Sequence, residues 1–142
     1  MKVKDWMSRS VVSLDLSSSL EDIARVMREG KISSVVITDG GKPVGMITER
    51  DLVIKVIAKG LDYKSLRAKD IMSFPLITIN KDKELEEAAN LMIMKGIRRL
   101  VVIEDETKQM VGIITTSDIA RSLAKEESLL LKAIALYHEE GY

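Results

Sequence analysis

The same arrangement of polar side chains occurs twice in the sequence. The segment GMITERD contains Thr48 and Asp51, and the segment GIITTSD contains Thr115 and Asp118. In each copy, apolar residues precede a threonine and an aspartate follows three positions later. A carboxylate in such a position can accept hydrogen bonds from both hydroxyls of a ribose, while the threonine offers a hydroxyl to ribose or phosphate. A helix that starts here would add free N–H groups and a partial positive charge, which suits an anionic ligand.

A purely structural role competes with ligand binding at these positions. Threonine commonly caps the start of a helix, and aspartate is favoured in the first helical turn. Both interpretations remain open at this point.

The two copies differ in the basic residues nearby. Arg98 and Arg99 begin a strand-like run in the second copy, where the first copy has Ser33 and Ser34. Arginine is well suited to phosphate because its planar guanidinium makes paired, charge-assisted hydrogen bonds. Neighbouring residues on a strand point to opposite faces, so only one of the two arginines is expected to reach a ligand. The alternative is a solvated pair at the start of a strand.

The repetition extends through most of the chain. KDWMS at 4–8 returns as KDIMS at 69–73, and LEDIARVM at 20–27 returns as LEEAANLM at 85–92. The copies are 65 residues apart at these helices and 67 apart at the glycine of the repeated motif. The second copy must therefore hold two extra residues, which we assign to the longer segment EDETKQM.

Hydrophobic periodicity predicts the element order β-α-β-β-α in each copy. Short β-rich runs at 11–14 and 76–79 come first, and Asp39-Gly40-Gly41 predicts a hairpin turn between two later strands. Ser18 and Glu21 have the spacing of a capping box at the first helix. The predicted inward stripes of the first helices are Leu20, Ile23, Ala24 and Met27, and Leu85, Ala88, Ala89 and Met92. Those of the second helices are Leu52, Val53, Val56 and Ile57, and Ile119, Ala120, Leu123 and Ala124.

These elements predict an α/β (α+β) fold with helices covering the sheets. A unit of this size is marginal alone, so we expect the two repeats to pack together about a pseudo-twofold axis. The expected boundaries are 4–66 for the first repeat, 67–125 for the second and 126–142 for an added C-terminal helix.

The composition excludes several classes of function. The chain has 142 residues, 22 basic and 22 acidic side chains, no cysteine and a single histidine. A balanced charge gives no reason to expect nucleic acid or an anionic membrane as the partner. The absence of a cysteine or histidine cluster argues against a metal site, and nothing identifies a nucleophile with an activating base, so no enzyme is expected. Lacking an apolar leader or a run long enough to cross a bilayer, the protein is expected to be cytoplasmic.

The repeated motifs, taken together, resemble those of tandem CBS-domain proteins over residues 4–125. The resemblance implies a stand-alone, non-catalytic regulatory module that binds adenine nucleotides (AMP, ADP or ATP, with AMP foremost) and requires no cofactor. It also implies a homodimer in which four repeats form a disc. Because the sequence contains no effector domain, the signal is expected to pass to a partner protein whose identity is unknown.

The resemblance further implies that each ligand cleft combines residues of both repeats. In the primary cleft, Val12 and Ile32 are expected to sandwich the adenine, and Ser33 to reach phosphate or ribose. The whole primary set is Val12, Ile32, Ser33, Arg99, Thr115 and Asp118. A second cleft is expected from Thr48, Asp51, Ile77, Thr78, Ile97 and Arg98. It is expected to be weaker because Ser34 stands where the primary cleft has Arg99.

Two other functions compete with nucleotide sensing. One is a structural or adaptor protein whose clefts bind nothing. The other is a binder of S-adenosylmethionine, which would not need Arg99, or of nucleic acid, which the balanced charge and the scarcity of aromatic residues disfavour.

Overall fold

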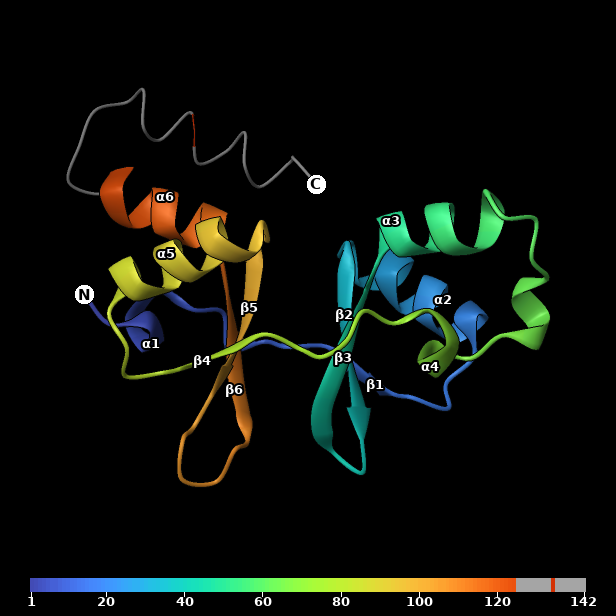
Figure 1. Cartoon of the computed structure of the whole chain (residues 1–142), viewed down its shortest axis with the longest axis horizontal. Coiled ribbons are helices and arrows are strands. Elements are labelled where there is room, and N and C mark those ends of the chain that lie inside the picture. The colour runs from blue at the N-terminus through green and yellow to red at the C-terminus, as the bar shows by residue number, and fades with distance from the viewer. Residues whose placement is uncertain (125–133, 135–142) are drawn as a thin grey trace. The chain divides into compact units, whose positions relative to one another are not determined.

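In the part of the chain that the computed structural model describes, residues 1–124 and residue 134, the strands form two three-stranded sheets of the same topology (Figure 1). The first contains β1 (Ser13–Asp15), β2 (Ser34–Asp39) and β3 (Lys42–Thr48), and the second contains β4 (Thr78–Asn80), β5 (Arg99–Ile103) and β6 (Met110–Thr115). In each sheet the first strand runs parallel to the second, and the third is antiparallel to the second. The predicted β-α-β-β-α repeat is confirmed.

The turn between β2 and β3 has the predicted hairpin form. Gly40 and Gly41 adopt φ angles of 57° and 86°, a left-handed conformation that glycine reaches without steric penalty. In the second sheet the corresponding connection is longer, and Lys108 there has φ 59°. The two extra residues of the second repeat therefore fall in this loop, as expected.

The first helix of each repeat packs its apolar stripe on its own sheet. These helices are α2 (Leu20–Gly30) and α5 (Leu85–Lys95). Three of the four predicted positions are buried in each helix, and the exceptions are Ala24, which is exposed, and Ala89, which is half-buried. The capping-box prediction is wrong by one residue: Ser19 caps α2 by accepting a hydrogen bond from the Asp22 amide at 3.1 Å. The carbonyl of Ser18 instead accepts a hydrogen bond from the Ala68 amide.

The second helices bury only some of the side chains predicted, among them Val56 and Ala124. In the first repeat, α3 (Glu49–Asp51) continues into η1 (Leu52–Ile57), and in the second repeat the helix is α6 (Thr116–Ala124). Val56 is buried, but Val53 is 50% exposed and Ile57 is 72% exposed. The reason is that η1 is a π-helix, whose wider turns shift the side chains away from the 3.6-residue period. Leu123 of α6 is also exposed, contrary to prediction.

The compact units of the structure do not coincide with the sequence repeats. One unit, the first-repeat unit, is Val11–Leu76, and the other, the second-repeat unit, joins Met1–Ser10 to the chain from Ile77 onward. The segment at 1–10, with α1 (Val3–Trp6), therefore packs on the second repeat. The segment at 67–76, with α4 (Ala68–Ile71), packs on the first, which also contains the short helix η2 (Tyr63–Ser65). We call these two stretches the leading segments.

Each leading segment lies against the outer strand of the sheet that it completes. Ser8 and Ile113 exchange backbone hydrogen bonds of 2.8 and 2.9 Å, as Ser73 and Met46 do at 2.9 and 3.2 Å. A Cβ atom on Gly112 would lie 2.7 Å from the carbonyl oxygen of Ser8. Gly45 has the same relation to the carbonyl of Ser73, at 2.9 Å. The repeated motif therefore begins with glycine because a leading segment crosses it.

Each unit has its own apolar core, built almost entirely from aliphatic and methionine side chains. The buried members are Leu20, Ile23, Met27, Val35, Ile37, Ile47, Val56, Ala68 and Ile71 in the first-repeat unit. In the second-repeat unit they are Val3, Met7, Ile79, Leu85, Ala88, Met92, Leu100, Val102 and Ile114. The predicted C-terminal helix at 126–142 lies outside the described residues. Within residues 1–124, every helix is too short or too polar to cross a membrane.

Candidate functional site

The carboxylate of Asp118 is held inside the second-repeat unit at the start of α6. Its Oδ2 accepts hydrogen bonds from the Thr115 amide at 2.8 Å and from the Thr115 hydroxyl at 3.0 Å. The Asp118 amide in turn donates to the Thr115 hydroxyl oxygen at 3.3 Å. Its Oδ1 pairs with the guanidinium of Arg121, one turn along the helix. Asp118 is only 5% exposed, so its carboxylate does not face bulk water.

Arg99 stands beside this cluster. It is the first residue of β5 and pairs in register with Thr115 of β6, which brings the two Cβ atoms within about 5.5 Å of each other. The neighbouring Arg98 is exposed, and its carbonyl accepts a hydrogen bond from the Thr116 amide at 3.0 Å. The side chains of Arg99, Thr115 and Asp118 therefore start from neighbouring positions at one end of the second sheet.

The first-repeat unit contains the same polar arrangement without the arginine. Thr48 caps α3 by accepting a hydrogen bond from the Asp51 amide at 3.2 Å, and the Asp51 Oδ2 accepts from the Thr48 amide at 2.9 Å. The Asp51 Oδ1 lies 3.2 Å from the ammonium of Lys55. The register partner of Thr48 is Ser34, at the position that Arg99 occupies in the other unit. Its half-site therefore lacks a guanidinium.

Both aspartates thus perform the capping role that was one of the two interpretations of their spacing. This role uses Oδ2 in each repeat and leaves Oδ1 with a cation from the same helix. An ionised carboxylate offers about four lone-pair positions, so a ribose that binds here would share or displace the cation on Oδ1 while the cap on Oδ2 stays in place.

The apolar residues predicted for the clefts occupy matching positions in the two repeats. The carbonyl of Val12 accepts a hydrogen bond from the Val36 amide at 3.1 Å just before β1, and Ile77 holds the same position before β4. Ile32 and Ile97 are half-buried and follow the first helix of their repeats. Val12 is 39% exposed.

Each predicted cleft draws on both units. Of the primary set, the first-repeat unit holds Val12, Ile32 and Ser33, and the second-repeat unit holds Arg99, Thr115 and Asp118. Of the second set, the first-repeat unit holds Thr48 and Asp51, and the second-repeat unit holds Ile77, Thr78, Ile97 and Arg98. The structure brings residues together within each unit, and the meeting of the two half-sites stays a prediction.

Sequence reasoning missed the cations that accompany the two aspartates. Lys55 lies four residues after Asp51, and Arg121 lies three residues after Asp118. Helix positions three or four apart face each other, so a basic residue at that spacing was the available signal.

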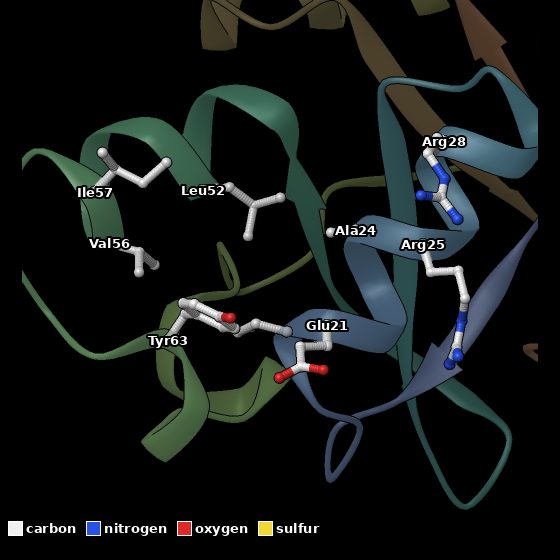
Figure 2. Close-up of a pocket in the computed structure, with 9 residues that line it drawn as sticks. Glu21, Ala24, Arg25, Arg28, Leu52, Val56, Ile57 and Tyr63 are labelled. Atoms are coloured by element: carbon white, nitrogen blue, oxygen red, sulfur yellow. The ribbon is translucent and has the colours of Figure 1, made fainter.

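The first-repeat unit also carries an apolar groove of about 530 Å³ between its helices. In Figure 2, Leu52 and Val56 of η1 face Ala24 of α2, with Tyr63 of η2 beside them. The remaining lining residues are Leu20, Glu21, Arg25, Arg28 and Ile57. A groove of about 390 Å³ occupies the matching position between α5 and α6 and is lined by Ala89, Met92, Ile93, Gly96, Ile97, Arg98, Thr116 and Ile119.

Comparison with known proteins identifies relatives of similar sequence. An uncharacterized protein of Methanopyrus kandleri is 46% identical over 112 residues, covering 78% of this chain. The chain spans little more than half of that relative, 57% of its length.

Solved structures share the fold. An uncharacterized conserved protein from Pyrococcus horikoshii superposes with a TM-score of 0.77 at 30% identity, covering 90% of this chain and 94% of that one. The CBS domain pair of protein MJ0100, solved with 5′-methylthioadenosine and S-adenosyl-L-methionine, superposes with a TM-score of 0.78 at 28% identity, covering 89% and 98%. The CBS domain family model matches the chain twice, over residues 3–58 and 68–125, which include both half-sites and both sheets. The chain therefore belongs to the CBS domain family.

Proposed function

We propose that the protein is a non-catalytic regulatory module that binds an adenine nucleotide between its two repeats. AMP is the foremost candidate, ahead of ADP and ATP. The observation that carries the proposal is the cluster of Arg99, Thr115 and Asp118, in which groups suited to phosphate and to ribose lie side by side.

Different residues are proposed to bind the ribose, the phosphate and the adenine of the ligand. Asp118 accepts the ribose hydroxyls, and its burial strengthens those hydrogen bonds because the surroundings are less polar than water. Arg99 binds the phosphate through its planar fork. Val12 and Ile32 of the other repeat enclose the adenine, as in other pockets where apolar walls surround a few fixed polar contacts. The second cleft, which has Ser34 where the primary cleft has Arg99, binds the nucleotide more weakly.

The ligands of the MJ0100 pair support the adenosine part of this proposal, since both contain adenosine. They also make S-adenosylmethionine the second candidate. Arg99 favours the nucleotide, because a guanidinium pairs with phosphate and is repelled by the positive charge of a sulfonium.

Calorimetry with AMP, ADP, ATP, 5′-methylthioadenosine and S-adenosylmethionine tests the proposal. Asp118→Asn should remove the tighter binding step of all five, because it takes away an acceptor of the ribose hydroxyls in the primary cleft, and should leave the weaker step at Asp51. Arg99→Ser, which copies Ser34 of the first repeat, should weaken AMP by about tenfold or more and leave 5′-methylthioadenosine unchanged. A thermal-shift assay gives a second readout, since a ligand at 100 times its Kd adds about 2.7 kcal/mol of stability.

Two outcomes would contradict the proposal. If none of the five ligands binds, the protein is a structural or adaptor pair. If Arg99→Ser weakens AMP and 5′-methylthioadenosine equally, Arg99 does not recognise phosphate.

The output of such a module requires a further surface. We propose that a second copy of the chain covers the apolar grooves, since Ile57 is 72% exposed beside one of them and Ile93 is 79% exposed in the other. Light scattering should then report a dimer, and Ile93→Glu should convert it to a monomer. The effector protein that responds to the dimer is to be found by its ligand-dependent association.

A further inference from the structure

Lys55 joins three parts of the first-repeat unit. Its ammonium lies 3.2 Å from the Asp51 Oδ1, donates to the carbonyl of Ile71 at 2.9 Å and donates to the hydroxyl of Ser73 at 3.3 Å. The Lys55 side chain is 35% exposed and that of Asp51 14% exposed. One cation therefore contacts both the candidate ribose carboxylate and the leading segment at 67–76.

The leading segment is held at this point by few other bonds. Ser73 exchanges two backbone hydrogen bonds with Met46 of β3. Ile71 is buried, whereas Ser73 itself is exposed. Beyond Ile71 the segment is held by those two backbone bonds, by Met72, which packs against the first-repeat core, and by the Lys55 side chain. Because Ser73 itself is exposed, loss of Lys55 should be felt there.

The second repeat is built differently at the same place. Ser122 holds the position that corresponds to Lys55, and its hydroxyl donates to the carbonyl of Ile119 in its own helix at 2.6 Å. The cation that pairs with Asp118 is Arg121, three residues along. The lysine contact to a leading segment is therefore a feature of the first repeat.

A ribose at Asp51 must compete with Lys55. The Asp51 Oδ2 accepts the hydrogen bond from the Thr48 amide that closes the helix cap, and Oδ1 faces Lys55, so the lysine contact is the one that a ribose can displace without opening the cap. Two ribose hydroxyls that donate to this carboxylate would share or replace the lysine contact. Without its carboxylate partner, a lysine on a flexible stem gains hydration and conformational freedom by moving into solvent.

We propose that Lys55 is a positioning residue that couples occupancy of Asp51 to the leading segment at 67–76. This coupling rests on the proposed function, because the ligand that would occupy Asp51 is an adenine nucleotide in the second cleft. Because of this coupling, the ligand binds with different affinity when the leading segment at 67–76 is held by Lys55 and when it is released. Such a difference in affinity is the condition for a ligand to shift a conformational equilibrium.

Amide hydrogen exchange at Ser73 and Met46, in the full chain with and without saturating AMP, measures the coupling. AMP should speed exchange at these amides by about two- to tenfold, the range expected for losing one hydrogen bond. In Lys55→Met, exchange should already be fast without AMP and should not respond to it. Lys59→Met is the matched control: Lys59 is exposed on the same part of the chain, and its loss should leave the response intact.

Calorimetry on the same samples separates the two proposals. If none of AMP, ADP and ATP binds, the proposed function fails and this coupling fails with it. If AMP binds and Asp51→Asn removes one binding step while Ser73 exchange stays constant in the wild type, only the coupling is overturned. If Asp51→Asn leaves every binding step unchanged, no ligand reaches Asp51 and the coupling is likewise overturned.

Discussion

Replacing Gly112 by alanine tests whether the repeated motif begins with glycine for steric reasons. The added methyl group would lie 2.7 Å from the Ser8 carbonyl oxygen and 2.6 Å from the Met7 sulfur. Ordinary contact begins near 3.4 Å, so the leading segment must retreat by about 0.7 Å. The Met7 side chain can rotate away, but the Ser8 carbonyl belongs to backbone that exchanges two hydrogen bonds with Ile113.

The expected loss of stability follows from these contacts. Overpacking costs about 1–3 kcal/mol, and weakening two backbone hydrogen bonds adds about 0.5–1.5 kcal/mol each. We therefore expect Gly112→Ala to lower the free energy of unfolding by about 2–6 kcal/mol, or Tm by roughly 5–25 °C for a chain of this size.

Denaturant unfolding and differential scanning calorimetry provide the assay, with Gly30→Ala as control. A Cβ on Gly30 would meet Ile32 at 3.6 Å, an ordinary contact, and alanine is the better helix former. That variant should be as stable as the wild type or slightly more so. If Gly112→Ala is no less stable than Gly30→Ala, the steric explanation of the motif is wrong.

Three further changes have outcomes fixed by the structure. Lys31 ends α2 with φ 52° where Gly96 ends α5, so Lys31→Gly should raise unfolding free energy by about 0.5–1 kcal/mol by relieving left-handed strain, measured by urea denaturation. Val3→Ala truncates a fully buried side chain of the second-repeat core and should lower the free energy of unfolding by about 2–3 kcal/mol. Hydrogen exchange should become faster in β5 and β6 before it does in β2 and β3. The reverse order would refute the assignment of residues 1–10 to the second-repeat unit. Hydrogen bonds from Lys4 and Lys2 hold the pKa values of the Asp82 and Glu84 carboxyls below their usual 3.8 and 4.5. The ion pairs that attach residues 1–4 should therefore persist above pH 4.5 and weaken as the pH falls through the lowered pKa values. Measuring hydrogen exchange at the Val3 amide against pH, at low and at high salt, should show this loss in acid.

Local sequence alone determined the elements of this protein. The Asp-Gly-Gly turn, the apolar stripes of α2 and α5 and the order of strands are encoded within stretches of about ten residues, because backbone preferences and side-chain periodicity act over that range. The repetition of Thr-x-x-Asp likewise identified the two candidate half-sites without any structure.

Other features depended on partners far away in the chain. The pairing of Arg99 with Thr115 follows from strand register, and the burial pattern of η1 follows from a π-helix that periodicity does not reveal. Two of the three contacts of Lys55 join a helix to a segment sixteen and eighteen residues later. A local pattern cannot specify such contacts, since each requires two surfaces to meet.

The assignment of the leading segments shows the division most clearly. KDWMS at 4–8 opens the first repeat in the sequence yet packs on the second, and KDIMS at 69–73 opens the second repeat yet packs on the first. The sequence determined that both segments are alike and that a glycine opens each motif. Only the tertiary structure decided which sheet each segment completes, because that choice depends on packing and hydrogen bonding between residues about a hundred positions apart at Ser8 and Ile113.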